Sequence, residues 1–388
     1  MKTLSSIALK LASAGALCFM MFCFSCSKDE EVLSDDDRII RKYTTLTSSP
    51  FNYRPELPSF FNSHFIRIQD NTPADNPVTD WGATLGRVLF YDRQLSQNYS
   101  TSCASCHVQQ FGFTDTARFS KGLHGGRTKR SSMSLLNARY YISGRFFWDE
   151  RAATLEEQVL QPIQDKVEMG LSIDSLENRL RQTELYPALF RKAFGSPDID
   201  RKKISKALAQ FVRSMVSYRS KFDEGRAKVN SKDEDFPNFS AEENLGKSIF
   251  MGNKQVNCSG CHTTEAFIMD NPRNNGISVD NPDAGIYVHT GNSLDIGKFK
   301  APSLKNIGLR KHFMHDGRLH SLEEVIVHYS TGIQANPNLD THLFDMNNGK
   351  PFAMNLSADE IRALKAFLLT LTDEEIIRDE KFSSPFRH

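Results

Sequence analysis

Four cysteines and two histidines form the pattern with the clearest chemistry in this sequence. They occur as CASCH at residues 103–107 and CSGCH at residues 258–262. In a C-x-x-C-H sequence, two thiols add to the two vinyl groups of a haem, and the adjacent histidine supplies a nitrogen ligand to the iron. We therefore predict two covalently attached c-type haems, with His107 and His262 as iron ligands. The predicted haem-binding residues are Cys103, Cys106, His107, Cys258, Cys261 and His262.

Zinc binding and thiol–disulfide exchange are the alternative uses of such cysteine pairs. The two pairs lie 155 residues apart in the sequence. The pairs of a compact zinc site usually lie within about 20 residues of each other. A redox dithiol does not need a histidine after each pair. Haem attachment therefore accounts best for the pattern.

The sequences around the two motifs repeat, which indicates a duplicated module. LGRVLF (85–90) precedes the first motif, and LGKSIF (245–250) precedes the second. Further along the chain, SLLN (134–137) corresponds to SLKN (303–306). A repeat of this kind predicts one structural unit that is built twice.

The elements that must position these motifs are helices. Apolar residues at helical spacing predict helices over 201–218 and 358–371, and no segment has the pattern of a sheet-based domain,. We therefore predict an all-α fold of two cytochrome c-like domains, each with one c-type haem. The first domain is expected at residues 73–235 and the second at residues 236–388.

Composition and charge limit the classes of function. The chain has 388 residues, of which 39% are hydrophobic and 24% are charged, so it has enough apolar residues for packed cores,. Lysine and arginine (48) balance aspartate and glutamate (47), for a net charge of +1. This balance gives no reason to expect a nucleic-acid partner.

The N-terminal residues are typical of a bacterial export signal. Two lysines precede an apolar run over 11–24, which at 14 residues is shorter than the roughly 20 residues that a membrane-spanning helix needs,. Cys-Phe-Ser-Cys26 resembles a lipobox, so we predict a lipoprotein-like signal peptide (1–25) and lipidation of Cys26. Ordinary cleavage and an uncleaved anchor are the alternatives. Residues 26–72 are predicted to be a polar tether and extended lead-in. The protein is thus expected in the periplasm, touching a membrane only through its lipid anchor.

Longer strings carry a family resemblance. The chain contains LGRVLFYD, SCASCH, FGFTD, RFFWDERAATLEEQ, PIQDKVEMG and HDGRLHSLEEV in this order. Over about residues 72–372 it resembles the bacterial dihaem cytochrome c peroxidase and MauG family. The resemblance implies that hydrogen peroxide reacts at the first haem and that the second haem relays electrons to it. It implies as partners a small redox protein, such as a c-type cytochrome or a cupredoxin, or a protein substrate. It also implies a homodimer.

The same resemblance assigns roles to three further residues. Trp148 matches the tryptophan that lies between the haems in the family and is proposed to aid electron transfer. Glu168 and Gln158 match polar residues of the peroxide pocket. Cleavage of peroxide needs a group that takes a proton from one oxygen and returns it to the other, and a carboxylate does this. Glu168 is therefore the acid/base candidate, and Gln158 is expected to orient peroxide or water.

The second ligand of each iron separates the subtypes of the family. His124 lies in the loop where classical members place a switchable histidine, but an ungapped count from His107 puts Leu123 at that position. We expect either ligation by His124 or a surface histidine beside an open first haem. At the second haem, an ungapped count from His315 reaches Tyr329, where peroxidases carry methionine and MauG carries tyrosine. Tyr329 is the first candidate, and Met314, Met346 and Met354 are alternatives.

Calcium is the weakest ligand prediction. The family binds calcium between its domains through an asparagine side chain and backbone carbonyls. Here Ser131 takes the asparagine position, and the carbonyls correspond to those of Arg310 and His312. A serine hydroxyl is a poorer donor for a hard cation than an amide oxygen.

The resemblance thus predicts an enzyme, a dihaem c-type peroxidase that reduces hydrogen peroxide. The alternatives are a MauG-like oxidase that modifies a partner protein and a non-enzymatic dihaem electron-transfer cytochrome. The Gln158 and Glu168 pair favours an enzyme, because a pure electron carrier does not need it.

Overall fold

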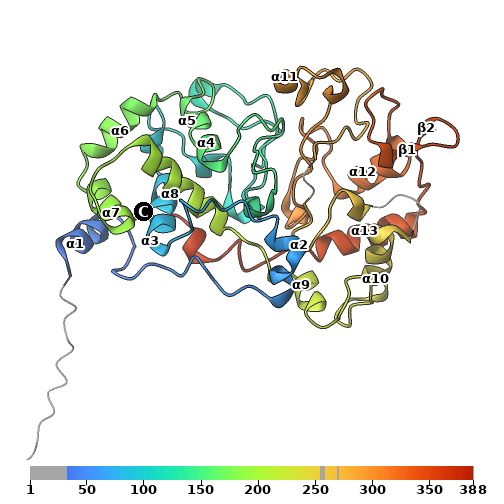
Figure 1. Cartoon of the computed structure of the whole chain (residues 1–388), viewed down its shortest axis with the longest axis horizontal. Helices are drawn as coiled ribbons and strands as arrows, with labels where there is room; N and C mark the ends of the chain where they lie inside the picture. Colours follow the sequence, from blue (N-terminus) through green and yellow to red (C-terminus); the bar gives the residue numbers. More distant parts are fainter. Residues whose placement is uncertain (1–32, 254–257, 269–270, 388) are drawn as a thin grey trace, which may run out of the picture.

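Two bodies lie side by side along the long axis of the molecule (Figure 1). The computed structural model describes residues 33–253, 258–268 and 271–387. The helices of the first body are α1 (Asp35–Tyr43), α2 (His64–Arg67), α3 (Asp80–Tyr91), α4 (Leu155–Gln158), α5 (Gln161–Gln164), α6 (Ile173–Arg181), α7 (Leu185–Phe194) and α8 (Arg201–Ser214). Those of the second body are α9 (Lys221–Arg226), α10 (Ala241–Ser248), α11 (Tyr287–Thr290), α12 (Leu322–Val327) and α13 (Ala358–Leu369).

Short turns of other helical types complete both bodies. Two five-residue π-helical turns follow α10 and α12, namely η7 (Ile249–Asn253) and η11 (His328–Gly332). Single 3₁₀ turns begin at each cysteine motif, η3 (Cys103–Ser105) and η8 (Cys258–Gly260). Among the described residues, the only strands are β1 (Phe344–Asp345) and β2 (Lys350–Pro351), which form one antiparallel hairpin. The chain is therefore mostly helical, as predicted.

The same crossing of two helices occurs in both bodies. Helix α3 packs on α8, and α10 packs on α13. A Cβ atom on Gly86 of α3 would lie 2.0 Å from the carbonyl oxygen of Ala207, and one on Gly246 of α10 would lie 1.9 Å from that of Ala363. Only glycine permits so close an approach of two backbones. The glycines of LGRVLF and LGKSIF therefore mark one helix crossing, repeated in the second body.

Asn137 and Asn306 form the same local backbone structure in the two bodies. Asn137 and Asn306 both have a φ of 60°. The backbone N–H of Asn137 donates to the carbonyl of Met215 after α8, and that of Asn306 donates to the carbonyl of Leu371 after α13. In each case the Asn Oδ1 accepts from the backbone N–H two residues after that carbonyl. The duplicated sequence thus builds a duplicated backbone.

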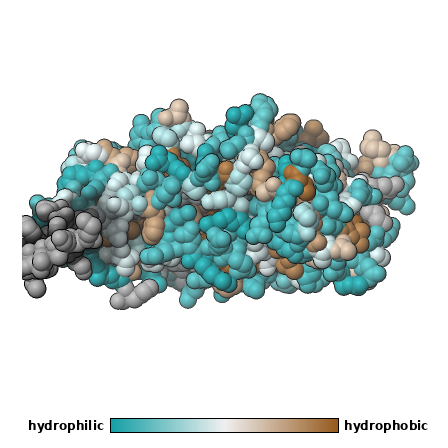
Figure 2. Space-filling view, turned by 90° about the horizontal axis from the view of Figure 1, so that it is seen from below, coloured by the Kyte–Doolittle hydropathy of each residue, from teal (hydrophilic) through white to brown (hydrophobic). Residues whose placement is uncertain are grey.

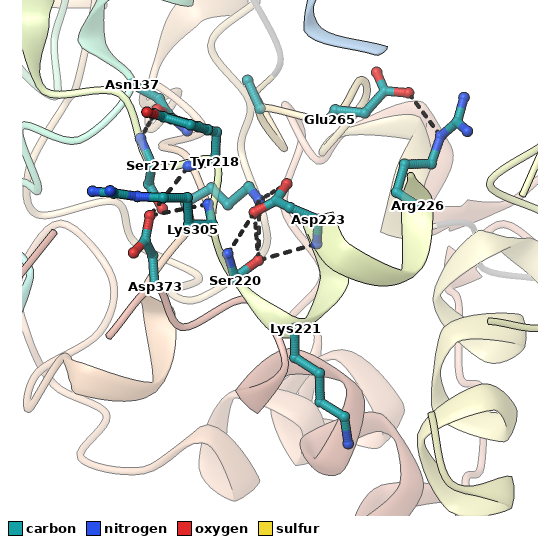
Figure 3. A network of polar contacts seen from close by, with 12 residues as sticks. Asn137, Ser217, Tyr218, Ser220, Lys221, Asp223, Arg226, Glu265, Lys305 and Asp373 are labelled. Atoms are coloured by element: carbon teal, nitrogen blue, oxygen red, sulfur yellow. Dashed lines mark hydrogen bonds and ion pairs between the residues drawn. The ribbon is translucent and has the colours of Figure 1, made fainter. Parts of the chain in front are cut away.

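Each body has its own apolar core. The first includes Phe90 and Phe211, and the second includes Phe222 and Phe367. A buried ion pair lies beside the second core (Figure 3): Lys305 Nζ donates to both carboxylate oxygens of Asp223 at 2.6 Å. Both side chains are almost fully buried. An apolar environment of this kind requires that such charges be paired.

Residues 33–72, which were predicted to belong to a polar tether and extended lead-in, pack on the first body. Ser34 caps α1, whose first turn carries three aspartates and whose last turn carries two basic residues,. Ile40 of α1 is buried in the first core, as are Tyr53 and Phe61. Apolar residues at these positions give the segment a surface to bury, which a purely polar tether lacks. The predicted signal peptide and Cys26 lie outside the described residues.

The C-terminal residues also differ from the predicted division at 235/236. Ile376, Ile377 and Phe382 belong to the first core, although the sequence assigned them to the second domain. The Phe382 ring meets the edge of Phe113 at 6.4 Å between centroids. Gln109 donates from Nε2 to two carbonyls of the same C-terminal segment. The chain therefore returns to the first body after completing the second.

The face of the molecule that Figure 2 shows is mainly hydrophilic. On the face that Figure 2 shows, apolar residues are scattered among polar ones over both bodies. Over the described residues, none of the helices combines the length and apolar character needed to cross a membrane.

Candidate functional site

The first cysteine motif holds its histidine in one orientation. Turn η3 places Cys103 to Ser105, and the following His107 directs Nδ1 at the carbonyl oxygen of Phe113, 3.0 Å away. Burial lowers the pKa of His107, so the ring is neutral,. A neutral ring that donates from Nδ1 leaves the Nε2 lone pair available to a metal. The protonation state and orientation of the His107 ring therefore suit an iron ligand.

The second motif repeats this arrangement. His262 Nδ1 points at the carbonyl oxygen of Phe267 at 3.4 Å, and burial lowers the pKa of His262 to about 4. Phe113 and Phe267 both have positive φ, 57° and 53°, which turns each carbonyl towards its histidine. This left-handed conformation is uncommon for a bulky residue, and it recurs at functional sites. The two motifs therefore share one supporting geometry.

The cysteines of both motifs are half-buried. Burial raises the pKa of Cys103 and of Cys258 to about 12, and that of Cys106 to about 11. None of the four cysteines forms a disulfide. The four thiols are thus available for thioether bonds in an apolar environment, which suits haem attachment.

A large cavity in the second body is the candidate pocket for the second haem. Cys258, Cys261 and His262 line it together with Tyr329 and Met314. Apolar side chains contribute most of the remaining wall, including Phe250, Phe313, Leu322, Val325, Ile326, Leu343, Leu364 and Leu368. A haem needs an apolar pocket with one histidine and two thiols at its edge. The residues present fit that group.

The side-chain amide of Asn275 contacts both Tyr329 and Met314. Asn275 Nδ2 donates to Tyr329 Oη and contacts Met314 Sδ, in both cases at 3.2 Å. Burial raises the pKa of Tyr329 to about 12. Both candidates for the second ligand of this iron therefore point into the cavity that contains His262.

The other methionine candidates lie differently. Met354 lines the same cavity, whereas Met346 is 80% exposed. Met346 follows β1 in the hairpin, so it points into solvent in this conformation. The structure brings Tyr329, Met314 and Met354 together and leaves Met346 outside.

Glu168 lies beside the first motif. It follows α5 in a turn in which its backbone N–H donates to Asp165 Oδ1 at 3.1 Å. Burial, with a further contribution from the Asp165 carboxylate, raises the pKa of Glu168 to about 7. The Glu168 charge adds to the effect of burial in raising the pKa of both Cys103 and Cys106. Gln158 is half-buried at the end of α4, ten residues earlier.

The loop that contains His124 packs on the Glu168 turn. The backbone N–H of Leu123 donates to the carbonyls of Val167 and Glu168. The Leu123 side chain is buried, whereas His124 is exposed and has a φ of 52°. This geometry favours a surface histidine over ligation by His124.

Trp148 lies where the two bodies meet. Its side chain is buried and donates from Nε1 to the carbonyl of Ser131 at 2.8 Å. Its own carbonyl accepts from the backbone N–H of Lys300 in the second body, and its ring lines the cavity that contains His262. Trp148 thus belongs to the first repeat and contacts the haem pocket of the second.

The predicted calcium donors do not fit calcium. The Arg310 guanidinium lies among them, donating from Nε to the carbonyl of His312 at 2.5 Å and from Nη2 to Ser131 Oγ at 3.1 Å. Calcium requires six to eight oxygen ligands. The Arg310 side chain occupies two of the three predicted donors, the His312 carbonyl and Ser131 Oγ, so a set of oxygen ligands for calcium is not left.

The comparisons agree with this geometry. The sequence profile of the family described as di-haem cytochrome c peroxidase matches residues 81–231 and 240–374. The chain belongs to this family. Membership implies two c-type haems, and it makes the protein an oxidoreductase that acts on peroxide.

Individual relatives include both subtypes. The MauG protein of Methylorubrum extorquens is 35% identical over 315 residues, covering 78% of this chain and 81% of the relative. The cytochrome c551 peroxidase of Nitrosomonas europaea is 31% identical over 300 residues, covering 76% and 80%. The crystal structure of a MauG-like protein associated with microbial copper homeostasis has a TM-score of 0.72 and 30% identity, covering 88% of this chain and all of that one. The family is therefore established, whereas the subtype is not.

Two residues of the site escaped the sequence reasoning. Asn275 lies in an irregular loop, and no pattern in the sequence marks it. Arg310 was considered only for its backbone carbonyl, although an arginine beside the predicted calcium donors was itself a signal. Both act through side chains whose direction depends on loop conformation.

Proposed function

We propose that the protein is an exported dihaem c-type peroxidase that reduces hydrogen peroxide at its first haem. The observation that supports this most is the Glu168 carboxyl, half-buried beside Cys103 and Cys106 with a pKa raised to about 7. A group with this pKa exchanges protons readily at neutral pH. A pure electron carrier has no use for such a group.

The haems would be held through thioether bonds to the two cysteine pairs, with His107 and His262 as iron ligands. Haem iron supplies the redox chemistry of peroxide cleavage. Glu168 accepts a proton from the bound peroxide and returns one to the departing oxygen, while Gln158 orients the substrate. Trp148 connects the first body with the pocket of the second haem. Arrival of electrons from a c-type cytochrome or a cupredoxin then completes the cycle.

Spectra of the ferric holoprotein test the proposal directly. We expect electron paramagnetic resonance to show one high-spin haem, before or after partial reduction, and steady-state assays to show peroxide reduction with an electron-donor protein. Two low-spin haems in every redox state, without peroxide turnover, would establish the electron-transfer cytochrome instead.

A MauG-like oxidase is the second candidate, and Tyr329 favours it. Tyr329 shares the cavity with His262, and an anionic oxygen ligand stabilises higher oxidation states of iron better than a thioether does,. The protein substrate would then supply the electrons. Mass spectrometry of candidate partner proteins after reaction with peroxide distinguishes the two: new covalent modification indicates the oxidase, and its absence with rapid cytochrome oxidation indicates the peroxidase.

Export, lipidation at Cys26 and a homodimer remain part of the proposal. Cell fractionation of Cys26→Ser against the unchanged protein tests the anchor, since only the unchanged protein should stay with membranes. Sedimentation of the purified holoprotein tests the dimer.

A further inference from the structure

All three polar groups of Ser131 are hydrogen-bonded, and two of them, the backbone N–H and the hydroxyl, bond residues of the other body. Its backbone N–H donates to the carbonyl of His315 at 2.8 Å, and its carbonyl accepts from Trp148 Nε1 at 2.8 Å. Its hydroxyl accepts from Arg310 Nη2 at 3.1 Å. Trp148 belongs to the same body as Ser131, whereas Arg310 and His315 belong to the other. The position of Trp148 at the junction is thus fixed by what binds Ser131.

Arg310 is the cation of this junction. The residue is 9% exposed, and its guanidinium also lies 5.8 Å from the centroid of the Trp148 ring. Among the residues that the structure describes, no carboxylate pairs with Arg310, and its contacts are a carbonyl, a hydroxyl and an aromatic face. Neutral oxygen atoms therefore compensate its charge, as they compensate the charge of a protein-bound metal ion.

A calcium ion and this guanidinium compete for the same atoms. The His312 carbonyl and Ser131 Oγ are donors that the family resemblance assigns to calcium, and Arg310 binds both. Two positive groups at one set of neutral oxygens repel each other. Burial lowers the pKa of Arg310 to about 10, so the guanidinium stays charged at neutral pH and the competition there does not depend on protonation,.

We propose that the Arg310 guanidinium replaces calcium at the junction and positions Trp148 between the two haem modules, so that the protein needs no calcium. Arg310 is a positioning residue: it contacts Ser131 and the Trp148 ring, and it need not touch peroxide. The proposal concerns the metal content and the haem environment, so it stands or falls separately from the peroxidase assignment.

Metal analysis of the holoprotein gives the first test. After dialysis against millimolar calcium and gel filtration, we expect no stoichiometric calcium, and chelation is expected to leave the visible spectra and peroxide turnover unchanged. One retained calcium per chain, or loss of turnover on chelation with recovery on adding calcium, overturns the proposal.

Variants give the second test. Arg310→Met is expected to slow turnover by about tenfold or more, because small displacements between reacting groups cost large factors in rate. It should also alter the low-temperature spectra of the haems. Arg310→Lys keeps the charge and should recover part of the loss. Lys311→Met is the matched control, because Lys311 is the exposed neighbour and its backbone carbonyl is unchanged.

The double variant Ser131→Asn with Arg310→Met restores the family's amide oxygen and frees the carbonyl of His312. Isothermal titration should then detect calcium binding that the unchanged protein lacks. Spectra and turnover of Arg310→Met identical to those of the unchanged protein would overturn the positioning role. If Arg310→Met does not fold, the metal content still tests the replacement of calcium, and the Arg310→Lys spectra still test the positioning role.

Discussion

At the scale of single residues, the proposed peroxidase function depends on how burial changes the chemistry of a carboxyl group. Glu168 occurs in an ordinary polar string, and only its position in a turn beside the first cysteine motif raises its pKa to about 7. An isolated glutamate in a sequence is usually a solvated surface residue. The resemblance located Glu168, and the structure supplies the physical reason why it is suited to proton transfer.

Glu168→Gln should reduce kcat/KM for peroxide by about 10²–10⁴-fold, the usual contribution of a positioned acid/base group. Stopped-flow mixing of the holoprotein with peroxide measures the effect. Glu157→Gln is the control, because Glu157 is an exposed glutamate on α4. Equal rates for both variants would remove Glu168 from the mechanism.

The raised pKa of Glu168 also fixes the direction of the pH dependence. The base form is the one that accepts the peroxide proton, so kcat/KM should rise with pH up to about 7 and level off above it,. Below the pKa, the rate should fall about tenfold for each pH unit. A profile with its midpoint near pH 4.5 would indicate a solvated carboxyl.

Tyr329 and Met314 make opposite predictions about the second haem. If Tyr329 binds iron, Tyr329→Phe should change the low-spin signal of that haem, and Met314→Leu should leave the signal unchanged. If Met314 binds iron, the reverse holds. Electron paramagnetic resonance of both ferric variants, measured side by side, decides between them.

At the scale of elements, the duplication is the feature that sequence revealed best. The paired cysteine motifs marked the repeat. The helices predicted over 201–218 and 358–371 appear as α8 (Arg201–Ser214) and α13 (Ala358–Leu369). These elements are local: periodicity and capping residues determine them. Packing partners are not local, so the burial of apolar residues in 33–72 was not predicted, and the segment was expected to be a tether and extended lead-in.

Gly246→Ala tests the helix crossing. Its added methyl group would lie 1.9 Å from the Ala363 carbonyl oxygen. Overpacking of this kind should lower the free energy of unfolding by about 1–3 kcal/mol. Glu242→Ala, at an exposed position of the same helix, should change it by less than about 0.5 kcal/mol. Urea unfolding followed by haem absorbance compares the two.

At the scale of the whole molecule, charged pairs hold the two bodies together. Lys300 Nζ of the second body donates to Glu150 Oε1 of the first at 2.7 Å, and the two side chains are 1% and 10% exposed. Arg130 contacts Asp149 in its own body and Asp283 in the other. Nothing in the sequence paired these residues, because such contacts depend on how two complete modules dock.

Removing one partner of a buried pair withdraws the opposite charge that offsets the desolvation of the other. Glu150→Gln should therefore destabilise the protein by about 3–5 kcal/mol, and adding Lys300→Met should recover part of the loss. Lys298→Met removes one partner of a more exposed pair and should cost no more than about 1 kcal/mol,. Unfolding of the holoproteins in urea measures all three; equal costs for Glu150→Gln and Lys298→Met would contradict a buried pair.

The return of the C-terminal segment to the first body has a consequence for biogenesis. Phe382 supports Phe113, whose carbonyl orients His107, so the first module packs fully only after almost the entire chain has been synthesised. Cys103 and Cys106 emerge much earlier. We therefore expect haem binding at the first motif to precede closure of its module by the last residues of the chain.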